Sequence, residues 1–96
     1  MEEENQETQE SFEEEKQIGT VSNYFAHVGV AAIKLTDSLK VGDTIRFKGG
    51  DVDFEQVVES MQIHHNNVEE AKTGDEVGIK VKEKVRKGYK VFKKIS

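Results

Sequence analysis

The sequence predicts an all-β fold, a small closed barrel of about six strands, in a chain of 96 residues. Two similar stretches carry this prediction, LKVGDTIRF at residues 39–47 and KTGDEVGIKV at residues 72–81. In each, a Gly-Asp pair follows polar residues and leads into alternating apolar and polar residues, the pattern of a tight turn before a half-buried strand. Short strands at regular spacing favour a closed barrel over an open sheet, because closure removes unpaired edges.

The expected strands, in chain order, cover residues 18–28, 30–35, 44–48, 54–63, 76–81 and 89–95. The first two are rich in β-branched and aromatic residues, and Gly29 separates them, so we expect a hairpin or a bent pair. The third follows the Gly42-Asp43 turn. Its alternation places Ile45 and Phe47 on one face and the basic residues 46 and 48 on the other.

Residues 54–63, FEQVVESMQI, are ambiguous between strand and helix, because Phe54, Val57, Val58 and Met61 also fit a helical period. We favour a strand with a bulge near Val57 and Val58. A lone helix of ten residues would lack a clean N-cap and would have only strands as neighbours.

The strand at residues 76–81 places Val77, Ile79 and Val81 on the inner face and lysines on the outer face. Together with Ile45 and Phe47, these three residues form the predicted core. In the last strand Tyr89 and Val91 share one face, although the alternation there is imperfect.

Charge is distributed unevenly along the chain, whose net charge is −5. Residues 1–16 contain eight glutamates and one lysine, so we expect a disordered acidic tail there, followed by one domain at residues 17–96. Residues 80–96 contain eight basic side chains against Glu83 alone. This contrast indicates either a basic face for an anionic partner, with the tail as its competitor, or ordinary solvated surface.

The composition also limits the kinds of chemical site that the chain can form. The chain has no cysteine, which excludes disulfides, thiolate metal sites and thiol nucleophiles, and no apolar segment is long enough to span a membrane. We expect a cytoplasmic protein without membrane contact, and no cofactor or metal is expected. The adjacent His64 and His65 would need a loop conformation and a carboxylate from Glu69 or Glu70 to hold a metal, so ordinary loop chemistry is favoured.

Catalytic signatures are weak throughout the sequence. Ser22, His27 and Asp37 could be written as a triad, but no nucleophile-elbow motif surrounds the serine. The paired Asp51 and Asp53 flank a turn, where aspartate is favoured for local hydrogen bonding. The sequence therefore predicts a binding module that is not an enzyme.

Three segments carry a family resemblance: VSNYFAHVGVAAIKLTDSLKVGDTIRF, VVESMQIHHNNVEEAKTGDEVGIKV and VRKGYKVF, within residues 18–92. They resemble the second domain of translational GTPases such as elongation factor Tu and initiation factor two. They are also similar to stand-alone translation elongation factor-like proteins and to the C-terminal barrel of collagenase-like peptidases. The resemblance implies a six-stranded Greek-key barrel that contacts RNA, at the acceptor end of tRNA or on the ribosome.

The chain departs from the translation-factor pattern at three points. It has no GxxxxGK[ST] loop, so no nucleotide triphosphate is expected as a ligand. Only Gly29 occupies the glycine positions of the first hairpin, where Ala31 or Ala32 takes the second. The last turn reads KGYK in place of RGD, which puts Tyr89 at the position of a turn aspartate.

Two functions remain open at this point. In the first, basic side chains contact the phosphates of RNA or a ribonucleoprotein, and two tyrosines stack on bases. The candidate residues are Arg46, Lys48, Lys80, Lys82, Lys84, Arg86, Lys87, Lys90, Tyr24 and Tyr89. In the second, the chain is a protein-interaction module that docks on a peptidase-like or translation partner through a sheet edge or the barrel mouth, without RNA contact.

Overall fold

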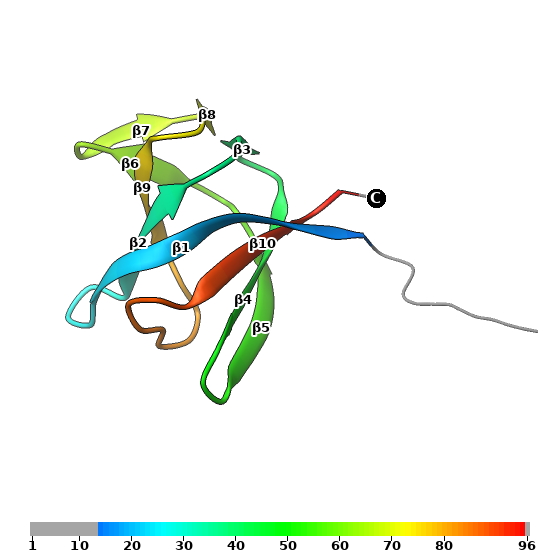
Figure 1. Ribbon diagram of the computed structural model, residues 1–96. Coiled ribbons are helices and arrows are strands. Elements are labelled where there is room, and N and C mark those ends of the chain that lie inside the picture. The colour runs from blue at the N-terminus through cyan, green and yellow to red at the C-terminus, as the bar shows by residue number, and fades with distance from the viewer. Residues whose placement is uncertain (1–13, 96) are drawn as a thin grey trace, which may run out of the picture.

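The computed structural model describes residues 14–95, which form ten β-strands and no helix (Figure 1). The predicted all-β class is confirmed. The strands are β1 (Glu15–Phe25), β2 (Val30–Leu35), β3 (Leu39–Lys40), β4 (Thr44–Gly49), β5 (Val52–Val57), β6 (Met61–Ile63), β7 (Asn66–Val68), β8 (Glu70–Ala71), β9 (Glu76–Lys80) and β10 (Lys90–Lys94).

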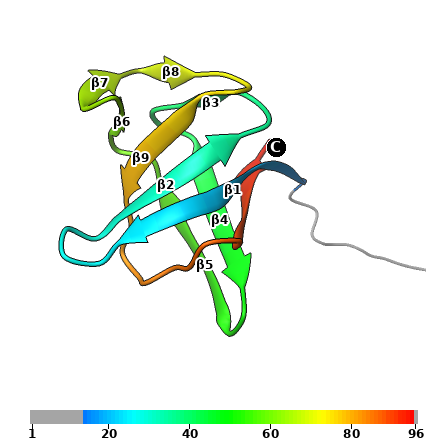
Figure 2. The same cartoon turned by 60° about the vertical axis from the view of Figure 1, so that its left-hand side comes forward.

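The strands form two antiparallel sheets in place of one closed barrel. Eight strands follow the order β5-β4-β10-β1-β2-β9-β6-β7 in a strongly curled sheet, and β3 pairs with β8 (Figure 2). Within residues 14–95 no ladder joins β5 to β9. The Gln56 side chain bridges this gap instead, because its Nε2 donates to the Lys80 carbonyl oxygen at 2.9 Å and its Oε1 accepts from the Lys82 amide at 3.0 Å.

The two Gly-Asp turns have the same hydrogen bonds. In each, the aspartate carboxylate accepts a hydrogen bond from the backbone amide three residues earlier. The Lys40 amide donates to Asp43 at 2.9 Å, and the Lys72 amide donates to Asp75 at 3.0 Å. The glycines have φ values of 100° and 95°, which explains why glycine stands there. Each turn also holds the end of another strand by two main-chain bonds: Gly42 and Asp43 hold Val58, and Gly74 and Asp75 hold Leu35.

Residues 54–63 are extended, as predicted, but they are split between β5 and β6. The Val58 amide donates to the Asp43 carbonyl and the Val58 carbonyl accepts from the Gly42 amide, both at 2.8 Å. These bonds to the first Gly-Asp turn take Val58 out of the ladder with β4. The result is a break between two strands where a bulge was expected, and together with the short strands β3, β7 and β8 it raises the strand number above six.

The core lies on the concave side of the curled sheet. All five predicted core residues are buried, with exposed fractions from 0% for Ile45, Phe47 and Val77 to 8% for Val81. Phe47 and Phe54 stack with their ring centroids 5.0 Å apart. The described residues include no buried polar or charged side chain, so this core is entirely apolar.

The first strand begins inside the segment that was expected to be a tail. Glu15 pairs with Lys94 in the β1–β10 ladder and its carboxylate lies 3.2 Å from Arg46 Nη1. Lys16 forms an ion pair with Asp37. These contacts place Glu15 and Lys16 in β1, whereas the rest of the predicted tail, residues 1–13, lies outside the described residues.

Candidate functional site

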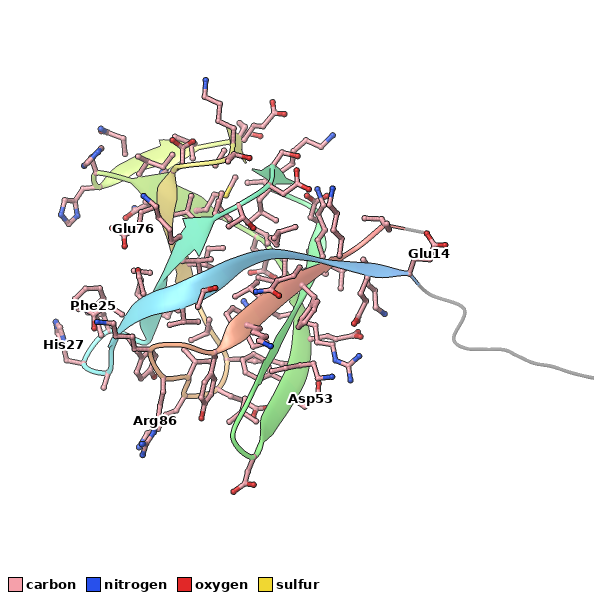
Figure 3. All side chains as sticks on the ribbon, in the orientation of Figure 1. Glu14, Phe25, His27, Asp53, Glu76 and Arg86 are labelled. Atoms are coloured by element: carbon pink, nitrogen blue, oxygen red, sulfur yellow. The ribbon has the colours of Figure 1, made fainter. Side chains whose placement is uncertain are left out.

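A groove of about 850 Å³ runs along the outer face of β2, β9 and β6. Alternation along β2 buries Ala31, Ile33 and Leu35 and leaves the side chains of Val30, Ala32 and Lys34 on the groove side. Phe25 at the end of β1, His27 in the β1–β2 turn and Glu76 at the start of β9 all line the groove (Figure 3).

Small residues form the floor of the groove. Gly78 of β9 lies directly opposite Ala32 of β2 and is also bridged to Gln62 of β6. A Cβ at Gly78 would come 3.4 Å from Val30 Cγ1, an ordinary contact, so nothing in the backbone demands glycine here. The missing side chain leaves the sheet surface open. Glycine inside a strand often marks such a close approach by a partner, and this signal was available in the sequence.

Two turns form the rim of the groove. Phe25 and Val28, at the tip of the β1–β2 hairpin, are 40% and 48% exposed. On the other side His64 and His65 connect Ile63 to Asn66 in the β6–β7 hairpin, with φ values of 51° and 67°. Two positive φ values in a two-residue loop are typical of a type I′ turn, which normally contains Asn-Gly. Left-handed conformations at residues other than glycine concentrate at functional sites.

Replacing His64 with asparagine and His65 with glycine should therefore stabilise the protein. Asparagine and glycine adopt positive φ with less strain than histidine, so we expect a gain of about 0.5–1.5 kcal/mol in the free energy of unfolding. Urea denaturation of both proteins measures it. Unchanged or reduced stability would mean that the histidine side chains contribute packing that outweighs the backbone strain.

Several polar groups beside the groove are satisfied within the chain. The Ser22 hydroxyl contacts the Glu76 carboxylate and lies 3.2 Å from the Ala32 carbonyl oxygen. Lys34 Nζ donates to the Gly74 carbonyl oxygen at 3.1 Å. Because these groups are already paired, the surface that remains for a partner is formed mainly by apolar side chains and imidazoles.

The structure does not assemble the catalytic or metal sets considered from the sequence. Ser22 is bonded to Glu76, whereas Asp37 is paired with Lys16. In residues 14–95 no group of three His, Asp or Glu side chains is arranged to hold a metal ion. None of the described elements is a helix long and apolar enough to cross a membrane.

Arg46, one of the predicted RNA-binding residues, is held by carboxylates. Its Nε and Nη2 donate to the two oxygens of Asp53 at 2.6 and 2.7 Å, and its Nη1 lies 3.2 Å from a Glu15 oxygen. Hydrogen bonding to Asp53 raises the pKa of Arg46, and the same bonds lower the pKa of Asp53 below its ordinary value of 3.8.

Acid titration should expose this pairing. The pKa of Asp53 is lower in the folded state than its ordinary value of 3.8. The pairing with Arg46 therefore stabilises the fold above pH 3.8, and this stabilisation is lost as the pH falls through the folded-state pKa. Arg46→Gln should raise the Asp53 pKa in carboxyl-detected NMR titrations. Asp37, whose pKa is lowered mainly by Lys16, serves as the control and should not respond. An Asp53 titration identical in both proteins would contradict the assigned pair.

The two predicted stacking tyrosines are half-buried against the core. The Tyr89 ring covers Gly49, where a Cβ would come 2.3 Å from Tyr89 Cδ1. Both tyrosines therefore have packing roles. Among residues 14–95, Phe25 is an exposed aromatic side chain, with 40% of its surface accessible.

The remaining predicted basic residues lie on several elements. Lys48 and Lys90 lie opposite each other on β4 and β10, whereas Lys80 ends β9. Lys82 Nζ lies 6.0 Å from the centre of the Phe54 ring. Lys84, Arg86 and Lys87 are exposed in the segment between β9 and β10. The groove was not among the predicted sites, because its walls come from three strands that are distant in sequence.

Comparison with known proteins relates the chain to peptidases. No protein-family model matches it. It is 47% identical over 77 residues to a Methanocaldococcus jannaschii protein named as an uncharacterized protease. This match covers 79% of the chain but 19% of the relative, so the chain spans about a fifth of that protein's length.

Similar solved structures also come from a peptidase. The C-terminal domain of a Geobacillus thermoleovorans protein described as a U32 peptidase superposes with a TM-score of 0.75 at 25% identity, over 84% of this chain and 93% of that domain. The selenomethionine variant of that domain superposes with a TM-score of 0.76 at 24% identity, over 79% of this chain and 96% of the domain. The expected likeness to the collagenase-like peptidase domain is supported, whereas the likeness to translation factors is not. The chain thus has the fold of a peptidase C-terminal domain and is similar in sequence to part of a protease.

Proposed function

We propose that this chain is a non-catalytic docking module that binds a peptidase partner through the β2–β9–β6 groove. The observation that carries the proposal is the 47% identity over 77 residues to one part of a much longer protease. A sequence retained within a protease, in a chain whose described residues assemble no catalytic set, fits an accessory role. RNA binding, the first interpretation of the sequence, gains no support from these relatives.

The groove has the physical character of a protein-docking surface. Phe25 and Val28 are exposed at its rim, and the half-buried Val30 and Ile63 extend the apolar surface along it. Contiguous exposed apolar surface on a small domain marks interaction sites, and an aromatic residue beside an open floor is a typical anchor. The open floor at Gly78 gives space for an apolar side chain of the partner.

The docking role predicts binding in trans. The test uses the Methanocaldococcus jannaschii protease with the segment that matches this chain deleted, so that the surface normally covered by that segment is free. The full 96-residue chain should bind this truncated protease in isothermal titration calorimetry. It should bind the intact protease much more weakly, because the protease's own segment already occupies the surface.

Two variants of this chain locate the contact. Gly78→Val fills the groove floor, where a Cβ would meet only ordinary contacts, and should weaken binding by about tenfold or more. Ser60→Val adds an apolar side chain at an exposed position that does not line the groove, and should leave binding unchanged. Circular dichroism checks that both variants and the truncated protease remain folded. Absence of binding to a folded truncated protease, or equal effects of the two variants, would overturn the proposal.

A further inference from the structure

A pair of lysines stands on the outer face of β4 and β10. Lys48 and Lys90 are direct cross-strand partners, and both point outward because their neighbours Phe47 and Val91 are buried. Both lysines are exposed. Like charges directly opposite each other on a sheet repel and destabilise it. A negative group between or above the two ammonium ends would relieve this repulsion.

The described residues supply only part of that charge. Asp53 on β5 is the cross-strand partner of Lys48 and attracts it electrostatically, but both oxygens of Asp53 are bonded to Arg46. On the other side Lys90 has the neutral Thr20 of β1 as its neighbour. Neither lysine forms a close ion pair within residues 14–95, and Lys90 has no carboxylate among its two cross-strand neighbours.

The surface around the pair is a shallow depression lined by Lys48, Gly49, Gly88, Lys90 and Phe92. We call these five residues the lysine cradle. Lys48 Nζ lies 6.0 Å from the centre of the half-buried Phe92 ring, which keeps the ammonium group over the cradle. Two glycines at its edge add no side chain that would obstruct a ligand. Two ammonium groups beside an open surface suit the carboxylates of an acidic segment.

Such a segment lies at the start of the same chain. Residues 1–13 contain six glutamates and no basic residue. The first strand begins beside the C-terminal end of β10, where the Ile95 amide donates to the Glu14 carbonyl oxygen at 3.0 Å (Figure 1). Lys90 of the cradle is five residues back from Ile95, about 17 Å away. Thirteen extended residues reach up to about 43 Å, so the acidic segment is long enough to return to the cradle.

We propose that the lysine cradle binds the glutamates of residues 1–13 of its own chain. Attachment at Glu14 gives the segment an effective concentration of the order of millimolar at the cradle, so weak ion pairs are sufficient. The bound segment neutralises the repulsion between Lys48 and Lys90. This inference does not depend on the docking role of the groove, which lies on β2, β9 and β6.

The chain has no cysteine, so a single nitroxide label can be placed on the acidic segment through Ser11→Cys. In the labelled full chain, NMR should show paramagnetic broadening of amide signals selectively at the lysine cradle. About 1 M NaCl, where the Debye length is about 3 Å, should remove the selective broadening. The reduced, diamagnetic label gives the reference spectrum.

A charge-matched pair of variants makes the test specific. Lys48→Gln with Lys90→Gln should abolish the selective broadening. Lys72→Gln with Lys80→Gln makes the same change in net charge at exposed lysines outside the cradle and should preserve it. Broadening that is uniform over the domain, that is strongest at the β2–β9–β6 groove, or that survives the Lys48 and Lys90 substitutions would overturn the proposal. Signal dispersion in each spectrum confirms that the variants are folded.

Discussion

Replacing Phe47 with alanine should lower the free energy of unfolding by about 3–5 kcal/mol. Phe47 is fully buried and stacks on Phe54 with ring centroids 5.0 Å apart, so the change removes the ring's transfer free energy and leaves a cavity beside a second aromatic ring. A domain of this size has a total stability of roughly 4–12 kcal/mol. The variant should therefore lose a large part of its stability, and urea denaturation followed by circular dichroism measures the loss.

Val57→Ala provides the matched control on the neighbouring strand. Val57 is 51% exposed on β5, and its truncation should change stability by no more than about 0.5 kcal/mol. Phe47→Ala with a loss below about 1 kcal/mol would place the ring outside the core and contradict the packing described above.

Gly49→Ala should cost about 1–3 kcal/mol, although it adds only one methyl group. The new Cβ would come 2.3 Å from Tyr89 Cδ1 and 2.5 Å from Tyr89 Cγ, atoms near the base of the ring that cannot move without displacing the whole side chain. Because Gly49 has no positive φ, crowding by Tyr89 is the expected cause, and backbone strain is not.

A double-mutant cycle separates these causes. In a Tyr89→Ala background the methyl group has space, so Gly49→Ala should cost no more than about 0.5 kcal/mol there. The coupling between the two changes is read from urea denaturation of the four proteins. An equal cost in both backgrounds would show that Tyr89 does not cover Gly49, and would favour Tyr89 as an exposed stacking residue.

The docking groove could not be predicted from the sequence. Its one sequence signal is Gly78, a glycine inside an otherwise regular strand pattern. The walls come from the hairpin tip at Phe25 and from the His64–His65 turn, which are separated by about forty positions in the chain. The lysine cradle is similar, because Lys48 and Lys90 become neighbours only through the pairing of β4 with β10.

The sequence by itself determined the all-β class, the two Gly-Asp turns and the inward faces of β4 and β9. These follow from local physics: strand side chains alternate with a period of two, and glycine supplies the positive φ that each turn needs. Ile45 and Phe47 are buried, as are Val77, Ile79 and Val81, for this reason.

Only the tertiary structure decided which strands are neighbours, and hence the open sheet, the groove and the lysine cradle. Alternation specifies the face on which a side chain lies, but it does not specify the strand beside it. The break at Val58 comes from its bonds to the first Gly-Asp turn, and Gln56 bridges the gap between β5 and β9 with a side chain. Both depend on segments that are brought together only when the whole chain has folded.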